Sequence, residues 1–321
     1  MKIGFTYDLR DDYLREGYSE EESAEFDEAQ TIDAIASALT SLGHSVDRIG
    51  GIRNLANRLS AGDRWDLVFN YAEGMFGFAR EAQVPALLDA YQIPYTFSDG
   101  LVFTVTLHKG MTKHVVRDLG IPTPDFAVVS DEAKAERVRL PFPLFVKPVA
   151  GGSSMGVSAA SYVEDQHALV VSCRDLIKKF RQPVLVEAFL PGRELTVGIV
   201  GTGSRARVLG VMEVIFTPDA EAHSYSYANK KQVHARYQIA SDGAAEDAAD
   251  VALRVWNGLG CRDGGRVDCR CDAQGRAQFL EVNPLAGLHP ILSDLVILAE
   301  FVGVSYQELI ESILESACER I

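Results

Sequence analysis

Cysteine, positive charge and long apolar runs are all scarce in this sequence. Five cysteines among 321 residues are too few and too irregularly spaced for a disulfide framework, and Cys269 and Cys271 do not have a zinc-binding spacing. We expect both to be packed, reduced thiols. The 31 basic residues against 45 acidic ones give a net charge of -14, which argues against nucleic acid or an anionic membrane as a partner.

No apolar stretch is long enough to cross a bilayer, and the first residues, "MKIGFTYD", lack the hydrophobic region of a signal peptide. We therefore predict a cytoplasmic protein that does not bind membranes. No Ser-His-Asp or Cys-His nucleophile arrangement is present, and the seven histidines are scattered. The length exceeds what one hydrophobic core usually fills, so two or three domains are expected.

Strand and helix patterns alternate over the first hundred residues. Strand patterns occupy residues 2–7, 44–50, 66–74 and 93–98, and helix patterns occupy 31–43, 52–62 and 80–92. This alternation predicts a parallel sheet with helices on its faces. Ligands bind beyond the carboxyl ends of such strands, which places Tyr7, Asp8 and residues 70–74 at a rim where substrate could bind. Solvated loops explain the same polar residues equally well.

The pattern changes from about Leu101. A helical stretch at 106–120 and a stiff proline connector at 121–126 precede a region dominated by strands, and two helices end the chain. The expected strands lie at 143–149, 156–161, 183–190, 193–201, 208–216, 265–272 and 277–284, and the helices at 293–303 and 306–319. We predict an α/β domain at 1–103, a small β-rich domain at 104–190 and an α+β domain at 191–321.

The stretch "FVKPVAGGSSMGVS", residues 145–158, places Lys147 at a strand end ahead of a loop of glycine and serine. Glycines let the backbone approach an anion closely, and N–H and hydroxyl groups donate to its oxygens. Because the lysine precedes the loop, the pattern is not a Walker P-loop. The loop therefore predicts a phosphate site, with a plain hairpin turn as the alternative.

Two further stretches carry acidic residues. In "LVEAFLPGRELTV", Glu187 and Glu194 are seven residues apart, and their spacing alone favours two solvated charges. The stretch "GRVDCRCDAQGRAQFLEVNP" predicts a hairpin with Asp268 on one strand, facing Glu281 and Asn283, which share a face of the other. These oxygens suit Mg²⁺ when phosphates complete its shell, and Arg266 on the same face can stabilise developing negative charge. A surface charge ladder is the alternative.

These residues resemble the ATP-grasp superfamily and, within it, the D-alanine–D-alanine ligase family. The similarity extends from about Pro94 to the C-terminus and is weaker before that residue. Its segments, in order, are "IPYTFSDGLVFTVTLHKGMTK", "GIPTP", "FVKPVAGGSSMGVS", "VLVEAFLPGRELTVGI", "GRVD" and "EVNPLAGLHP". The resemblance implies the ATP-grasp fold behind a Rossmann-like N-terminal domain, and the use of ATP with two Mg²⁺ ions, or Mn²⁺ as an alternative. It also implies a homodimer.

The resemblance further implies roles for individual residues. Lys109 and Lys147 would contact phosphates, and Ser153, Ser154 and Gly156 would form a phosphate loop. Glu187, Phe189 and Leu190 would line the adenine site, Glu194 would bind the ribose, and Lys230 would reach the γ-phosphate. Asp268, Glu281 and Asn283 would hold the metal, and Arg266 and the Gly287 N–H would stabilise a tetrahedral oxyanion, with Ser153 and Lys230 also acting in catalysis.

The departures from the family lie on the substrate side. "NYAEGMFGFARE" replaces the family's His-Gly…Gly-Glu-Asp-Gly stretch, and a tyrosine expected after Lys230 is Lys231. Leu292 falls about where the family has a serine that binds the second substrate's carboxylate. The candidate substrate-binding residues are Glu25, Asp27, Glu28, Arg80, Glu81, Lys231 and His289.

The leading hypothesis is an ATP- and Mg²⁺-dependent ligase that joins a carboxylate to an amine of small amino-acid-like substrates. The family chemistry converts the carboxylate to an acyl phosphate, which the amine attacks. A nucleotide-binding protein without ligase activity and a small-molecule kinase on the same fold are the alternatives.

Overall fold

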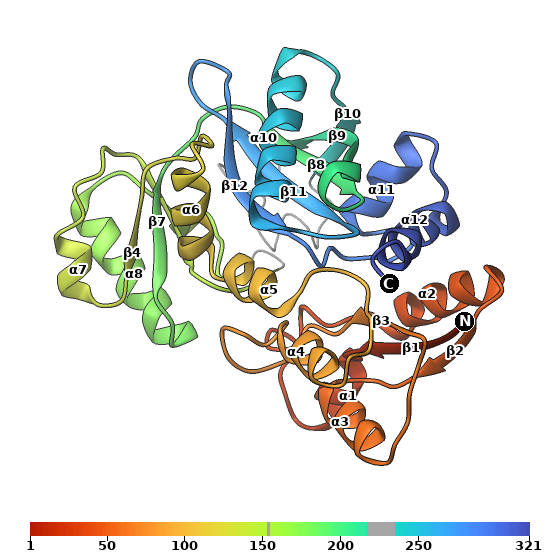
Figure 1. Cartoon of the computed structure of the whole chain (residues 1–321). Coiled ribbons are helices and arrows are strands. Elements are labelled where there is room, and N and C mark those ends of the chain that lie inside the picture. Colours follow the sequence, from red (N-terminus) through yellow and green to blue (C-terminus); the bar gives the residue numbers. More distant parts are fainter. Residues whose placement is uncertain (153–154, 217–234) are drawn as a thin grey trace.

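A computed structural model describes residues 1–152, 155–216 and 235–321. The chain forms three sheets, and Figure 1 shows the central sheet at the left, the C-terminal sheet in the upper middle and the N-terminal sheet below them. The predicted mixture of a parallel N-terminal sheet with β-rich and α+β regions is confirmed. The boundaries between residues 103 and 104 and between 190 and 191 stay predictions.

The N-terminal sheet is parallel, with β1 (Lys2–Tyr7) between β2 (Ser45–Arg48) and β3 (Leu67–Tyr71). Helix α2 (Ala29–Ser41) packs on one face, and α3 (Ile52–Ser60) and α4 (Gln83–Ala90) pack on the other. The short α1 (Arg10–Arg15) follows β1. The strand predicted at 93–98 is reduced to one bridge between Val68 and Tyr95, because positive φ angles at Gln92 and Phe97 limit the extended backbone on both sides.

The helix predicted at 106–120 is divided at His108 into α5 (Gly100–Leu107) and α6 (Lys109–Asp118). His108 has ψ 88°, which is not helical, and its side chain accepts a hydrogen bond from the Met111 N–H and so caps α6. The Lys109 N–H donates to the Val149 carbonyl at 2.9 Å and not to a carbonyl of α5, as it would in a continuous helix. This break turns Lys109 toward the strand that precedes the glycine-rich loop.

The central sheet is antiparallel, in the order β4 (Phe126–Val129), β7 (Val184–Ala188), β5 (Leu144–Pro148) and β6 (Tyr162–Val163). Helices α7 (Glu132–Glu136) and α8 (Gln166–Phe180) cover it and enclose a core of its own. The strand predicted at 156–161 is wrong. Gly156 has φ +75°, and a Ser158 capping box begins a short 3₁₀ helix at Ala159–Ser161.

The C-terminal sheet has the order β10 (Ala235–Ile239), β9 (Arg207–Phe216), β8 (Glu194–Val200), β11 (Gly264–Cys271) and β12 (Ala277–Asn283), with every pair antiparallel. A short 3₁₀ helix (Gly203–Arg205) lies between β8 and β9. Helix α10 (Gly243–Leu259) covers one face, and α11 (Asp294–Phe301) approaches the other over Gly198 and Gly210. Helix α12 (Tyr306–Cys318) ends the fold.

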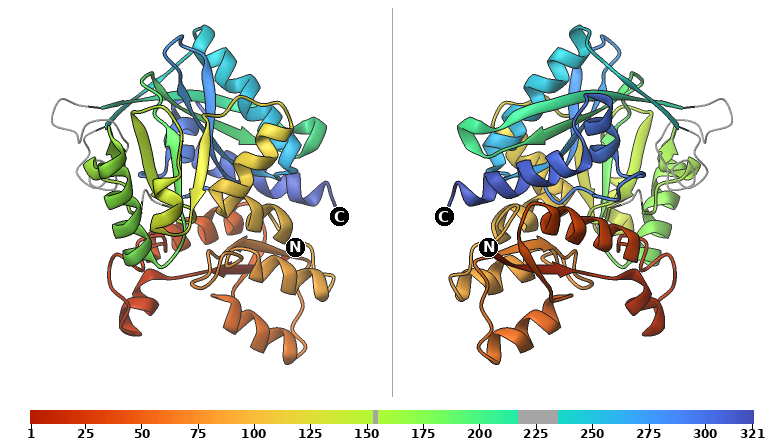
Figure 2. Two further views of the ribbon diagram at one scale, coloured as in Figure 1. Left: turned by 90° about the vertical axis from the view of Figure 1, so that its left-hand side faces the viewer. Right: turned by 90° about the vertical axis from the view of Figure 1, so that its right-hand side faces the viewer.

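The first and last parts of the chain share one hydrophobic core. Residues of β1, α2 and β3 pack with residues of α11 and α12, and Figure 2 shows α12 lying directly against the N-terminal unit. Asp263, fully buried before β11, joins them through polar contacts: it accepts from the Phe97 N–H, from the Ser316 hydroxyl and from the Arg320 guanidinium. The N-terminal and C-terminal units therefore form one packed body.

Candidate active site

The candidate site lies on the face of the C-terminal sheet opposite α10. Along β11, Val267, Cys269 and Cys271 point into the core under α10, so Arg266 and Asp268 point to the other face. The cross-strand neighbour of Asp268 on β8 is Thr196, whose hydroxyl donates to the Asp268 carboxylate at 2.9 Å. The buried cysteines are reduced, as expected.

A bulge in β12 completes this face. Asp268 pairs with Glu281, but Cys269 pairs with Phe279, so the register shifts by one residue between them. Phe279 and Val282 therefore both point into the core although they are three residues apart. Beyond the shift, Glu281 lies opposite Asp268, and Asn283 lies opposite Arg266. The predicted hairpin and the shared face of its four polar residues are confirmed, and a solvated charge ladder does not describe Asp268, which is 8% exposed.

The two carboxylates of the hairpin contact cations. The Arg266 guanidinium donates to Asp268 at 2.5 Å, and Lys109 Nζ lies 3.5 Å from Glu281. Asn283 also donates to the Asp268 carboxylate, at 3.3 Å. Two carboxylates and one amide are hard oxygen donors of the kind Mg²⁺ takes when phosphate and water supply the rest of its shell, so the residues present fit this ion. Among the described residues, no cluster of three or more His, Cys, Asp or Glu side chains has metal-site geometry.

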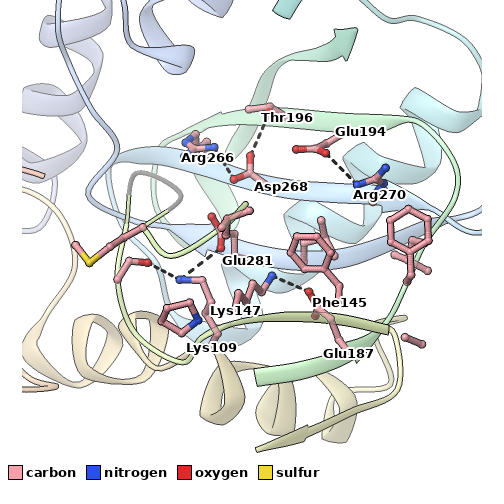
Figure 3. Close-up of a pocket in the computed structure, with 18 residues that line it drawn as sticks. Lys109, Phe145, Lys147, Glu187, Glu194, Thr196, Arg266, Asp268, Arg270 and Glu281 are labelled. Carbon is pink, nitrogen blue, oxygen red and sulfur yellow. Dashed lines mark hydrogen bonds and ion pairs between the residues drawn. The ribbon is translucent and has the colours of Figure 1, made fainter. Parts of the chain in front are cut away.

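A narrow cavity of about 110 Å³ lies between the central and C-terminal sheets (Figure 3). Its walls include the apolar side chains of Phe145, Val157, Leu190 and Leu280, and Phe189 stands under the Arg270 guanidinium at 5.0 Å from its ring centre. Lysines and acids line the rest. An apolar slot that opens onto cations fits a nucleotide base followed by phosphates.

Glu187 is buried at the base of this slot. One of its oxygens lies 2.7 Å from Lys147 Nζ, and the other lies 3.0 Å from Lys113 Nζ. Burial would raise the pKa of Glu187, but the two lysines hold it below its usual value. Burial lowers the pKa of Lys113 to about 8; it would lower that of Lys147 too, but Glu187 and Glu281 raise it. The interpretation of Glu187 as a solvated charge from its spacing is wrong, because both partners come from distant segments. Glu194 is not solvated either: it pairs with Arg270 at 3.4 Å.

The glycine-rich loop lies at the open end of the slot. Lys109 Nζ donates to the Gly151 carbonyl at 2.6 Å, and the Gly152 N–H donates to Glu25. At Gly156, a Cβ atom would lie 2.7 Å from Phe180 and Pro148, which adds to the requirement for glycine that its positive φ imposes. The connection from β5 to β6 spans residues 149–161, so it is not a tight hairpin turn. Ser153 and Ser154 lie outside the described residues, as do Lys230 and Lys231.

A second cavity of about 250 Å³ adjoins the first and is lined by carboxylates. Arg80 lies within it, 2.5 Å from Glu25 and 3.7 Å from Glu81, and both Arg80 and Glu81 are at most 9% exposed. Burial raises the pKa of Glu81 to about 7 and that of Asp27 to about 6. Four of the seven candidate substrate residues therefore line one cavity: Glu25, Asp27, Arg80 and Glu81.

Two other candidates lie elsewhere. Glu28 is exposed and pairs with Arg10 at 3.7 Å. The His289 ring is not part of the cavity wall, because its Nδ1 accepts from the N–H groups of Ile291 and Leu292 and closes a local turn. At the predicted rim, Asp8 is buried and accepts from the Tyr13 hydroxyl and the Gly74 N–H, so it shapes the loops around the cavity without lining it.

Tyr71 and Glu73, which lie within the rim predicted at residues 70–74, line the second cavity, and so does Ser293, which sequence reasoning missed. Burial raises the pKa of Glu73 well above its usual value, and the neighbouring Glu81 and Glu25 raise it further. Tyr71 ends β3 and Glu73 follows it, so their position at the carboxyl end of a parallel strand was the signal that predicted them. Ser293 follows Leu292, which was aligned with a substrate-binding serine but is 69% exposed.

The chain is similar to D-alanine–D-alanine ligases in sequence and in structure. The family model described as the D-ala D-ala ligase C-terminus matches residues 115–315. The D-alanine–D-alanine ligase of Bordetella petrii is 32% identical over 274 residues, which are 84% of this chain and 81% of that protein. The D-alanine–D-alanine ligase of Aquifex aeolicus is 33% identical over 289 residues, covering 89% of this chain and 94% of that protein.

Solved structures show the same fold. The D-alanine–D-alanine ligase of Bacillus anthracis complexed with ATP superimposes with a TM-score of 0.74 at 21% identity, over 100% of this chain and 98% of that one. The VanG D-Ala:D-Ser ligase of Enterococcus faecalis gives a TM-score of 0.74 at 19% identity, over 98% and 99%. None of the helices in the described parts of the chain has the length and apolarity needed to span a membrane. Within the ATP-grasp superfamily, the chain belongs to the D-alanine–D-alanine ligase family, whose members are ATP-dependent ligases that form a peptide bond between two amino acids.

Proposed function

We propose that this protein uses ATP and Mg²⁺ to join the carboxylate of one amino-acid-like substrate to the amine of a second, releasing ADP and phosphate. One observation carries the proposal. The apolar slot and the carboxylate-lined cavity share a wall made of Lys109, Gly151, Arg266 and Glu281. A nucleotide whose base lies in the slot would direct its terminal phosphate to that wall, where a carboxylate held in the second cavity would meet it.

In this proposal, different residues bind the nucleotide, the metal ions and the oxyanion. Glu187, Phe189 and Leu190 would hold the adenine, Glu194 the ribose, and Lys147 and Lys109 the phosphates. Asp268, Glu281 and Asn283 would hold the metal ions, which neutralise phosphate charge during transfer. Arg266 and the Gly287 N–H, on the cavity side of the shared wall, would stabilise the oxyanion that forms when the amine attacks. Ser153, Ser154, Gly156 and Lys230 complete the phosphate contacts in this proposal.

The second cavity is where substrate identity is decided. Its acid-rich wall differs from the family's His-Gly and Gly-Glu-Asp-Gly pattern. Two molecules of D-alanine are therefore one candidate substrate pair among several. VanG, named as a D-Ala:D-Ser ligase, has the same fold as this chain. A homodimer and a cytoplasmic location are part of the same proposal.

The test is turnover by the purified protein. ATP, Mg²⁺ and a panel of D- and L-amino acids should yield ADP and phosphate in equal amounts, with a dipeptide identified by mass spectrometry. A phosphorylated substrate without an amide would identify a kinase instead. Thermal stabilisation by ATP with no turnover on any substrate would identify a nucleotide-binding protein without ligase activity.

Arg80 should set affinity for the amino-acid substrates. Arg80→Met leaves Glu25 and Glu81 without their common cation, so the two carboxylates repel each other and the cavity wall rearranges. We expect the KM for the amino acids to rise about tenfold while the KM for ATP stays within about twofold of wild type. Arg10→Met, which removes an arginine paired with Glu20 and Glu28 outside the cavity, is the control. An equal rise in both KM values would contradict this role.

A further inference from the structure

The loop after β12 is held by two tyrosines from opposite ends of the chain. The Leu288 N–H donates to the Tyr71 hydroxyl at 2.7 Å, and the Leu288 carbonyl accepts from the Tyr306 hydroxyl at 3.0 Å. Tyr71 ends β3 in the N-terminal sheet, and Tyr306 begins α12. The Leu288 side chain is fully buried in the core that these elements share. Both polar groups of the Leu288 backbone are therefore fixed.

The residue before this clamp is Gly287, which lines the carboxylate-rich cavity together with Arg266. Within the described parts of the chain, no group accepts a hydrogen bond from the Gly287 N–H. A Cβ atom at this position would lie 2.8 Å from the Ser293 hydroxyl, so any larger residue would have to displace the Ser293 side chain. A backbone donor stabilises a developing oxyanion only when it is oriented before the reaction begins. The orientation of the Gly287 N–H depends on the peptide unit that follows it, which is the one bonded to Tyr71.

The Tyr71 hydroxyl also has an acidic neighbour. Because its oxygen accepts from Leu288, its proton remains available to an acceptor, and the Asp27 carboxylate lies beside it. Tyr71 is 4% exposed, and burial raises its pKa, so the hydroxyl stays protonated and can accept and donate together. A carboxylate of the N-terminal unit is thereby linked through one hydroxyl to the loop after the metal-binding strand.

We propose that Tyr71 and Tyr306 are positioning residues for peptide-bond formation. By holding the N–H and the carbonyl of Leu288, they orient the Gly287 N–H toward the carbonyl oxygen of the activated substrate, which becomes negatively charged when the amine attacks. The inference rests on the proposed function, since it assigns a role within that reaction. In this proposal each tyrosine acts through the backbone of Leu288.

The variants Tyr71→Phe and Tyr306→Phe remove one hydroxyl each and keep the ring, which is buried in Tyr71 and partly buried in Tyr306. We expect kcat for peptide formation to fall about tenfold in each, with the KM for ATP changed by less than about twofold. We also expect more ADP than peptide, because an activated carboxyl that waits longer for the amine is lost to water. The matched control is Tyr95→Phe, which removes a hydroxyl bonded to Asp89 at 2.9 Å in the same N-terminal unit. It should retain wild-type kcat and a one-to-one ratio of ADP to peptide.

A purely structural role would lower the melting temperature of the Tyr71 and Tyr306 variants without changing the ratio of ADP to peptide. That result, or wild-type kcat in both variants beside an active wild-type enzyme, would overturn the clamp and leave the ligase assignment standing. Absence of turnover in the wild-type protein itself would overturn the proposed function, and the catalytic role of the clamp with it.

Discussion

Asp268→Asn and Glu281→Gln should each reduce ADP formation by about 10³-fold. Each substitution removes one negative charge from a set of two carboxylates and one amide while keeping the shape of the side chain. Mg²⁺ binds such hard oxygen donors through their charge, and phosphoryl transfer depends on the ion to neutralise the phosphates. Because the two acids face each other across β11 and β12, neither can replace the other. Steady-state release of ADP, measured with saturating ATP and a range of Mg²⁺ concentrations, checks the prediction.

Two variants control for the loss of charge alone. Glu300→Gln and Asp250→Asn each remove one carboxylate from an exposed position on α11 and α10, and should leave ADP release unchanged. Melting temperatures separate misfolding from lost catalysis, since Asp268 also accepts from Thr196 and Arg266. Normal turnover by a folded Asp268→Asn or Glu281→Gln variant would contradict the assignment of these residues as metal ligands.

Asp263→Ala should cost about 3–5 kcal/mol of folding free energy. Asp263 is fully buried and accepts from the Phe97 N–H, the Thr202 and Ser316 hydroxyls and the Arg320 guanidinium, which belong to three separate segments of the chain. Removing the carboxylate takes away the acceptor of the buried Phe97 N–H and one of the acceptors of the partly buried Arg320 guanidinium. The midpoint of urea unfolding, followed by tryptophan fluorescence, measures the loss.

The comparison is Asp33→Ala, which removes an exposed ion pair with Arg48 and should cost no more than about 1 kcal/mol. Asp263→Asn keeps one acceptor oxygen and should fall between the two. If Asp263→Ala unfolds at the same urea concentration as Asp33→Ala, the contacts around Asp263 do not join the two ends of the chain.

The positions of the polar residues on the β11–β12 hairpin were predictable, because side chains alternate between the two faces of a strand. Asp268, Glu281 and Asn283 follow from strand periodicity on a hairpin, and the structure places them on one face. The bulge beside them was not predictable, because it depends on how β12 pairs with β11 and not on the composition of either strand. The burial of Glu187 was not predictable for a similar reason. Its two lysine partners lie 74 and 40 residues away in sequence, and the spacing between Glu187 and Glu194 does not indicate either of them.

Local backbone details explain the other differences. Positive φ angles at Gln92 and Phe97 interrupt an apolar run that otherwise has strand composition, and His108 divides a stretch with helical periodicity. The second cavity was predictable only in part. Its acidic residues come from two short polar stretches that the sequence shows directly. The hydrogen bond between Tyr71 and Leu288, in contrast, joins residues 217 positions apart. Contacts of that range are decided by tertiary packing, which a single sequence does not display.

The shared core of the first and last segments has a consequence for how reactants enter and leave. The N-terminal and C-terminal units pack as one body, whereas the central sheet encloses a core of its own. Motion between separately packed bodies costs less than motion within one core. A seam therefore runs between the central sheet and the shared core of the two chain ends, and it passes Gly151, where both cavities meet. In the proposed function, opening that seam would expose nucleotide and amino acid to solvent together, so their exchange should be coupled in time while the Tyr71–Leu288–Tyr306 contacts stay closed.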